Sequence, residues 1–358
     1  MIKHFSNIFK RIFTNEETVI FLIILIVTIA LFGLFSQILT PFIISIVVAY
    51  LLYGLQTKIE SYNVPELLAK IIAYSVFIII LIATFSWLIP LLIGEIEKFI
   101  ENIDGDDGYY TKFKNVVDSL ALTYPEVINT EQIGAFFTAV SDDISSITKS
   151  ILESSISAIQ STIEVLIYII LFPILVYFFL FDRKNILNGF AKILPGNREM
   201  LSKVWMEMDV QLSNYARGKA IEILVVGVLA AILFSIFDLE YTAILAVLVG
   251  LSVLIPYVGA FVVTIPVVII GLVDLGGLTT SFFILISLYL LLQFIDGYIL
   301  VPIIFSGAVK LHPLVIIFAV FLFGSLFGFW GVFFSIPLAT FIKAVWNAWP
   351  GAMSSSSD

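Results

Sequence analysis

The sequence predicts an all-α, polytopic integral membrane protein. Of the 358 residues, 60% are hydrophobic and only 13% are charged, and the mean hydropathy is +1.10. Soluble domains average about 45–50% apolar and 25% charged residues. Runs such as 19–35, 71–89, 165–181 and 221–237 approach the roughly 17–25 residues that cross a bilayer as helix. Because these runs are apolar on every face, they predict buried helices and not the alternating strands of a barrel.

The N-terminal part predicts an anchor followed by three spans. In residues 1–16 the apolar side chains share one helical face and the Lys and Arg side chains lie elsewhere. This pattern predicts a cytoplasmic amphipathic helix in the membrane interface. No small-x-small cleavage site follows the first apolar run, so we expect a retained helix. Within 17–93 we expect spans near 18–36, 40–56 and 68–92.

Residues 94–156 predict an acidic, extracytoplasmic helical segment. Within it, apolar residues follow heptad-like spacings of 4, 3, 4, 3 and 4 from Ile133 to Ile151. This seam indicates either a homo-oligomer contact through helices including 133–151 or packing against 95–122 of the same chain.

The remaining chain predicts a fourth span, a basic loop and a transmembrane core. A span is expected at 157–181, a basic segment at 182–217, a core at 218–345 and a tail at 346–358. Lys and Arg are retained on the cytoplasmic side of membranes, so both the basic segment and the N-terminus should be cytoplasmic. In all, about five to six full spans are expected.

Two apolar segments in the core have lengths that fit neither one span nor two. Segment 241–272 has 32 residues and segment 313–345 has 33. Each is too long for one ordinary span of about 20 residues and too short for two with a turn. We therefore expect a break at Pro256–Gly259 in the first and at Gly324, Gly328 and Gly331 in the second.

The two broken segments also read alike, as LIPYVGAFVVTIP at 254–266 and FGFWGVFFSIP at 327–337. When the topology is followed forward, they enter the membrane from opposite faces. Opposed, re-entrant-like segments interrupted by Gly and Pro are typical of transporters with an inverted repeat and a midplane site. The alternative is chance similarity, since Gly and Pro are common in membrane helices.

Polar residues in the core are candidates for a substrate or ion pathway. Gln293 and Asp296 are three residues apart and share a helical face near the inner end of a span at 277–296. They could coordinate a cation or a hydroxylated solute, or cap backbone freed at Pro302. Glu222 could handle protons or cations, or pair with Arg217 or Lys219 at the end of its span.

Three further residues carry weaker functional interpretations. Arg217 could hold a polar-oxygen substrate, or only obey the positive-inside bias. His312, before Pro313, could relay protons near pH 6.5 or serve a structural role at a helix start. Asp274 and Glu240 fall in short outer turns, where we expect them to be solvated.

Enzyme classes find little support in these residues, and we expect a non-enzyme without cofactor, metal or nucleic-acid partner. Cysteine is absent, His occurs twice, and neither a zinc-protease motif nor a phosphate-binding Gly-Lys-Ser/Thr loop is present. Asp274 and Asp296 fall near opposite ends of adjacent membrane segments and should not form an aspartyl pair. Transport should then be driven by a gradient.

The order of several core motifs resembles the autoinducer-2 exporter family of bacterial permeases. The matching stretches are Tyr215–Gly218, Ile255–Gly259, Leu292–Gln293 with Asp296–Gly297 and Val301–Pro302, Leu311–Leu314, and Gly324–Gly328 with Gly331 and Ile336–Pro337. Asp296 stands where the family often has Glu. The N-terminal half resembles the family only in its layout of spans.

The resemblance implies a multi-pass permease of the bacterial cytoplasmic (inner) membrane. Some relatives are assigned to export of a small polar solute, autoinducer-2, and others to exchange of sodium or lithium for protons. We therefore expect solute export, with monovalent cation/proton antiport as the alternative. A membrane-anchored scaffold that binds a partner without transport is the second alternative.

Overall fold

The computed structural model describes residues 16–102, 108–123, 158–196, 198–305 and 311–348. In these ranges every regular element is a helix and no strand occurs, so the all-α prediction is confirmed. The interfacial helix at 1–16 and the heptad seam at 133–151 lie outside the described residues, except for Glu16.

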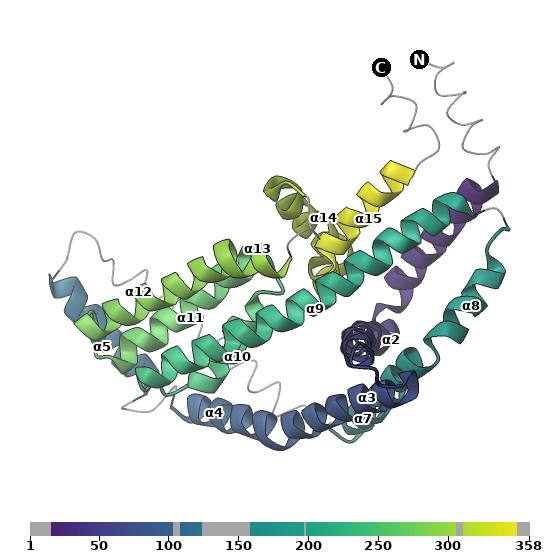
Figure 1. Cartoon of the computed structure of the whole chain (residues 1–358). Helices are drawn as coiled ribbons and strands as arrows, with labels where there is room; N and C mark the ends of the chain where they lie inside the picture. The colour runs from purple at the N-terminus through teal and green to yellow at the C-terminus, as the bar shows by residue number, and fades with distance from the viewer. Residues whose placement is uncertain (1–15, 103–107, 124–157, 197, 306–310, 349–358) are drawn as a thin grey trace, which may run out of the picture. The chain divides into compact units, whose positions relative to one another are not determined.

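The described helices are shown in Figure 1. Their bounds are α2 Glu16–Glu60, α3 Glu66–Ala83, η1 Thr84–Leu88, α4 Ile89–Glu101, α5 Tyr109–Thr123, α7 Ala158–Phe181, α8 Arg183–Ile193, α9 Glu199–Ile236, α10 Thr242–Ser252, α11 Val258–Asp274, α12 Thr280–Ile295, η2 Asp296–Leu300, α13 Val301–Ile304, α14 Pro313–Phe333 and α15 Ser335–Ala348. Both η1 and η2 are π-helical turns.

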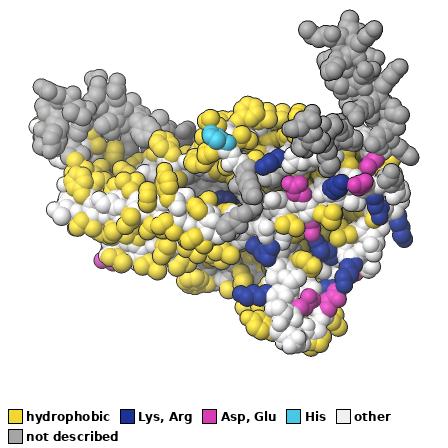
Figure 2. All heavy atoms as spheres, turned by 45° about the horizontal axis from the view of Figure 1, so that its top comes forward, with side chains coloured by type: hydrophobic (Ala, Val, Ile, Leu, Met, Phe, Trp, Pro, Cys, Tyr) yellow, Lys and Arg dark blue, Asp and Glu magenta, His cyan; other side chains and the backbone are white. Residues whose placement is uncertain are grey.

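In the described parts of the chain, six helical stretches are long and apolar enough to cross a membrane. They are Glu17–Phe35, Ile38–Glu60, Glu66–Phe99, Glu199–Ile236, Thr280–Ile304 and Pro313–Phe333. Figure 2 shows one face on which hydrophobic side chains cover much of the surface. Soluble monomers rarely expose apolar patches of such extent, whereas lipid contact requires them. The chain is thus a multi-pass membrane protein.

A kink inside α2 separates the first two predicted spans. Helix α2 runs through both, with its only non-helical backbone at Phe35 (φ −126°, ψ 24°). The candidate spans Glu17–Phe35 and Ile38–Glu60 lie on either side of this kink, close to the spans predicted near 18–36 and 40–56. Pro41 stays inside the helix, and the hydroxyl of Ser45 donates to its carbonyl oxygen over 2.6 Å.

Two other spans extend past their predicted ends through π turns. The span expected at 68–92 continues from α3 through η1 to the end of α4. The span expected to end at Asp296 continues through η2 into α13, as far as Ile304. Pro302 lies in this extension, so it does not end the helix. Asp296 consequently lies within a helix and not at its inner end.

The described chain forms two compact units, with boundaries inside α3, α7 and α9. Unit 1 comprises 1–78, 168–220 and 305–358, and unit 2 comprises 79–167 and 221–304. In unit 2 an apolar core is formed by the C-terminal half of α9 with α5, α10, α11 and α12. Gly227 of α9 and Gly250 of α10 meet there: a Cβ built on Gly250 would lie 3.1 Å from the Cα of Gly227. Small residues allow this close helix approach.

The first broken segment folds as a helical hairpin in unit 2. Helices α10 and α11 pack against each other and are joined by the five residues 253–257. Tyr257 adopts a positive φ of 64°. A Cβ on Gly259 would lie only 1.8 Å from the carbonyl oxygen of Ser252, so no larger residue fits there. The predicted break at Pro256–Gly259 is confirmed.

The second broken segment, in unit 1, also turns back on itself. Helix α14 has left-handed backbone at Gly328 (φ 59°, ψ −138°), and α14 packs against α15. A Cβ on Gly331 would lie 1.8 Å from the carbonyl oxygen of Phe323, the same distance as in the first hairpin. The 21 residues of α14 could span a membrane by length, but the Gly328 kink leaves only the 15 residues 313–327 before the reversal.

Ion pairs fix the start of α8 in unit 1. The guanidinium of Arg183 donates to Asp209 over 2.8 Å and lies 4.2 Å from the ring centre of Tyr53. The hydroxyl of Tyr50 donates to the same Asp209 oxygen over 2.7 Å. These contacts join α8 to α2 and α9.

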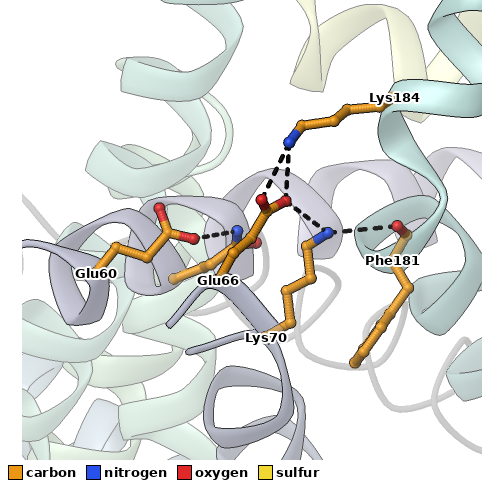
Figure 3. Close-up of polar contacts among 6 residues, drawn as sticks. Glu60, Glu66, Lys70, Phe181 and Lys184 are labelled. Atoms are coloured by element: carbon orange, nitrogen blue, oxygen red, sulfur yellow. Dashed lines mark hydrogen bonds and ion pairs between the residues drawn. The ribbon is translucent and has the colours of Figure 1, made fainter. Parts of the chain in front are cut away.

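A second group of charges surrounds Glu66 at the start of α3 (Figure 3). Lys184 pairs with both carboxylate oxygens of Glu66, at 3.0 and 3.1 Å, and Lys70 pairs with the same carboxylate at 3.0 Å. The Glu66 hydrogen bond raises the pKa of Lys184. Lys70 also reaches the carbonyl oxygen of Phe181, so the first turn of α3 and the last turn of α7 lie at one level.

Candidate functional site

A chain of hydrogen bonds crosses from α12 to α11 inside unit 2. The amide of Gln293 donates to the hydroxyl of Tyr289 over 3.0 Å, and that hydroxyl lies 3.2 Å from the hydroxyl oxygen of Thr264. Thr264 donates its own hydrogen to the carbonyl oxygen of Ala260 over 2.7 Å. A hydroxyl has only one hydrogen, so Tyr289 must be the donor to Thr264. The direction of the whole chain is thereby fixed, from Gln293 toward Ala260.

Asp296 continues this polar face at the start of the π turn η2. Tyr289, Gln293 and Asp296 are four and three residues apart, which places them on one side of the helix. The Asp296 side chain is buried, at 8% exposure, in a candidate membrane span. Single π turns inside α-helices are rare and are frequently found at functional sites. Gln293 and Asp296 both lie in the helical stretch Thr280–Ile304, and their shared face stays a prediction from their spacing.

Glu222 is a second buried carboxylate of unit 2, at 2% exposure. It lies on the face of α9 that also buries Val226, Ala230 and Phe234, at intervals of four residues. Burial at this position does not decide between the two interpretations of Glu222, because Lys219, one turn earlier on α9, is buried as well. The ring of Phe234 packs against Tyr289, with 6.2 Å between ring centres.

The course of the helices places Glu222 and Asp296 toward the same end of unit 2. Glu240, after α9, and Asp274, before α12, both contact the hydroxyl of Tyr109, so α9 arrives where α12 departs. The two helices are therefore antiparallel. From the Phe234–Tyr289 contact, Glu222 lies about 18 Å back along α9 and Asp296 about 10 Å onward along α12, at 1.5 Å per residue.

The remaining predicted residues of unit 2 lie in the first hairpin. Pro256 belongs to its turn, where its carbonyl oxygen accepts from the N–H of Val258 over 2.7 Å. Gly259 is buried against Ser252, as described above. Their role in the structure is to form the break.

Five predicted residues belong to unit 1. Gly324, Gly328 and Gly331 lie at the reversal inside α14. His312 is the N-cap of α14: its Nδ1 accepts from the N–H of Leu314 over 3.3 Å, and the residue is exposed. This cap favours the structural alternative for His312.

Arg217 is exposed and is engaged close to its own position on α9. Its guanidinium donates to the carbonyl oxygen of Ser213 over 3.1 Å and to the side-chain oxygen of Asn214 over 3.0 Å. Its Cδ lies against Gly54, where a Cβ would come within 2.6 Å. These contacts favour the interpretation of Arg217 as a basic residue that anchors α2 to α9.

Tyr289 and Thr264 were not predicted as site residues. The signal for Tyr289 is its spacing of four residues before Gln293, which extends the polar face by one turn. Thr264 had no such signal, because it reaches the chain from a different helix. Among the described residues, no group of three or more His, Asp or Glu side chains could hold a metal ion.

Taken together, several membrane-spanning helices, a broken helical hairpin in each unit and a buried polar face define the class of a polytopic membrane transporter. The sequence model of AI-2E family transporters matches residues 20–351. The chain therefore belongs to the AI-2E transporter family, and the resemblance inferred from its core motifs is confirmed.

Individual relatives agree with this assignment. "Putative permease PerM" of Escherichia coli (strain K12) is 38% identical over 350 residues, which cover 98% of each chain. "Putative transport protein YrrI" of Bacillus subtilis (strain 168) is 26% identical over 85% of this chain and 84% of its own. A "Putative transport protein" of Archaeoglobus fulgidus is 25% identical over 90% of this chain and 91% of its own.

Proposed function

We propose that the protein is a gradient-driven permease that exports a small polar solute, such as autoinducer-2, across the bacterial inner membrane. The observation that carries this proposal is the ordered hydrogen-bond chain from Gln293 through Tyr289 to Thr264, continued by Asp296. Amide, hydroxyl and carboxylate groups on one face suit a solute with several hydroxyl groups. The N-terminus lies in the cytoplasm in this proposal, by the Lys and Arg bias.

The two helical hairpins support a transport cycle of alternating access. In each, a glycine after the turn, Gly259 or Gly331, touches the backbone of the preceding helix. The shared geometry supports an inverted repeat, in which one hairpin rocks while the other holds its place. Glu222, Gln293 and Asp296 would contact the solute or the coupling ion.

Antiport of sodium or lithium against protons is the second candidate. It is favoured by one observation, the burial of two carboxylates, Glu222 and Asp296, in unit 2. Burying a carboxylate in an apolar environment favours its neutral form or a bound counter-charge. Exchange of a proton for a cation at such a group is the chemistry of an antiporter.

The deciding experiment measures proton flux in proteoliposomes under an imposed sodium or lithium gradient. Wild type is compared with Asp296→Asn and Glu222→Gln, and with Glu207→Gln as a control at an exposed carboxylate. Cation-dependent proton flux that both buried-site variants lose would establish antiport. Uptake of labelled autoinducer-2 into inside-out vesicles, without cation-driven flux, would establish export.

A third outcome would contradict both candidates. If neither flux exceeds that of empty liposomes, although the purified protein is folded, a partner-binding scaffold would be the better account. The Glu207→Gln control guards against a general effect of lowered charge, since its flux should equal that of wild type.

A further inference from the structure

A tyrosine hydroxyl joins two carboxylates at the end of unit 2 that contains α5. Tyr109, the first residue of α5, has its hydroxyl 3.0 Å from a carboxylate oxygen of Glu240 and within hydrogen-bond distance of Asp274. The backbone N–H of Glu240 donates to the other oxygen of Asp274 over 3.0 Å. The expectation that Asp274 is merely solvated is wrong, because the side chain is half-buried in these contacts.

The position of the hydroxyl is fixed by packing around its ring. Tyr109 is only 4% exposed, and its ring lies 5.3 Å from that of Tyr241 and 6.1 Å from that of Phe99. Its backbone N–H donates to the carbonyl oxygen of Asn102 over 2.7 Å. The hydroxyl contact therefore ties the start of α5 to the α9–α10 turn and to the end of α11.

Counting hydrogens shows that this arrangement depends on a proton. A phenol carries one hydrogen, so it can donate to only one of the two carboxylates. The second contact is a hydrogen bond only when that carboxyl is protonated and donates to the phenol oxygen. Two ionised carboxylates would instead face each other across one oxygen atom, at most about 6 Å apart, and repel.

Few charges around the cluster offset this repulsion. On α5, the ammonium of Lys112 is exposed and lies 5.5 Å from the ring centre of Tyr109. In the α9–α10 turn, Tyr241 faces the cluster and carries no charge. The carboxylate of Glu95 on α4 accepts hydrogen bonds from the N–H groups of Ala243 and Ile244, over 3.1 and 2.8 Å.

The ionisation properties of the cluster agree with its geometry. Burial raises the pKa of the Asp274 carboxyl, against hydrogen bonds from Tyr109 and Glu240 that lower it. Burial and the neighbouring Asp274 raise the pKa of the Tyr109 phenol, which therefore stays protonated. Asp274 lies outside the six candidate spans, as does α5.

We propose that Tyr109, Glu240 and Asp274 form a pH-sensitive latch. It holds the start of α5 against the α9–α10 turn and the end of α11 when the two carboxylates share one proton. Burial in the latch raises the pKa of the Asp274 carboxyl above that of a solvated aspartate, which lies near about 4. The latch is therefore fully stabilised below that value and weakens as the pH rises through the raised pKa. This inference does not rest on the proposed transport activity.

The test is hydrogen–deuterium exchange of residues 109–123 in the full-length protein in lipid nanodiscs, between about pH 5 and about pH 8. Rates are divided by the intrinsic exchange rate at each pH. We expect protection of α5 in wild type to fall about fivefold or more as the pH rises, the equivalent of about one hydrogen bond.

Three variants separate the latch from general destabilisation. Asp274→Asn keeps the side-chain shape and supplies N–H groups, so protection of α5 should no longer depend on pH. Tyr109→Phe should give low protection at every pH. Asp118→Asn, at an exposed acid of the same helix, should keep the wild-type dependence.

Two results would overturn the proposal. One is corrected protection of α5 that does not change with pH in wild type, and the other is an unchanged pH dependence in Asp274→Asn. Protection of α12 serves as the internal reference for folding. If Tyr109→Phe also lowers the protection of α12, that variant reports a general loss of folding. The Asp274→Asn result alone then tests the latch.

Discussion

The amide of Gln293 donates to the hydroxyl of Tyr289 one turn earlier on α12, across 3.0 Å. Tyr289 is completely buried, so Tyr289→Phe would remove the hydroxyl with little change of shape. We expect transport to fall about fivefold or more, the equivalent of one hydrogen bond of about 1 kcal/mol. Flux in proteoliposomes measures this change. Tyr168→Phe, at an exposed tyrosine of α7, should keep wild-type flux, and equal flux in the two variants would remove Tyr289 from the site.

Gly259 and Gly331 should tolerate no side chain. An alanine Cβ at either position would lie 1.8 Å from a backbone carbonyl oxygen, and only a shift of the hairpin could relieve that clash. We expect Gly259→Ala and Gly331→Ala to lower the free energy of unfolding by about 1–3 kcal/mol or more. Thermal unfolding in detergent gives the comparison. The control is Gly94→Ala, where nothing lies within 4 Å of the added Cβ, and a control as unstable as the variants would contradict the steric account.

Gly328 is sensitive for a different reason, since open space surrounds it. Its φ of 59° with ψ of −138° is a conformation that L-residues avoid. We expect Gly328→Ala to destabilise the α14–α15 hairpin by about 1–2 kcal/mol. Gly297→Ala, which also has open space but no positive φ, should be close to neutral. The same unfolding assay applies, and a stable Gly328→Ala protein would show that the kink is not required.

Asp209 should matter more to stability than an exposed ion pair on the same helix. It accepts hydrogen bonds from both Arg183 and Tyr50. The side chains of the Arg183–Asp209 ion pair are only 25% and 31% exposed. We expect Asp209→Asn to lower the free energy of unfolding by about 1 kcal/mol. The effect is smaller than for a fully buried ion pair, because both side chains remain partly exposed to water. Lys203→Gln, which breaks the more exposed pair with Glu199, should have no measurable effect. A melting temperature that drops equally in both variants would refute this ranking.

The sequence predicted where helices of the core break, but not where other helices continue past their expected ends. Gly and Pro at 256–259 and 324–331 mark real reversals, because backbone freed inside a membrane must be satisfied by neighbouring protein. The first two spans, predicted near 18–36 and 40–56, are likewise separated by a kink, at Phe35 of α2. The spans expected at 68–92 and 277–296 instead continue through the π turns η1 and η2, and no local pattern marked these extensions.

The candidate site was predicted in part. The three-residue spacing of Gln293 and Asp296 predicted a shared face, and both residues lie in the helical stretch Thr280–Ile304. Tyr289 was missed because the chain contains 14 Tyr and 33 Phe, so one more aromatic residue carries little information. The contact of Tyr109 with Asp274 joins residues 165 positions apart, and no local pattern predicts such a pair.

The π turn at Asp296 has a consequence for how this helix tolerates length changes. Its hydrogen bond from Val301 to Asp296 spans five residues, so the turn holds one residue more than an α-helix would. Deleting a single residue between 297 and 300 would restore ordinary helical winding, and Val301–Ile304 would keep its register with the side chains before Asp296. Adding a residue to a regular stretch of α12 would instead rotate all later side chains by about 100°. The helix should therefore tolerate a one-residue deletion best within the π turn that begins at the buried Asp296.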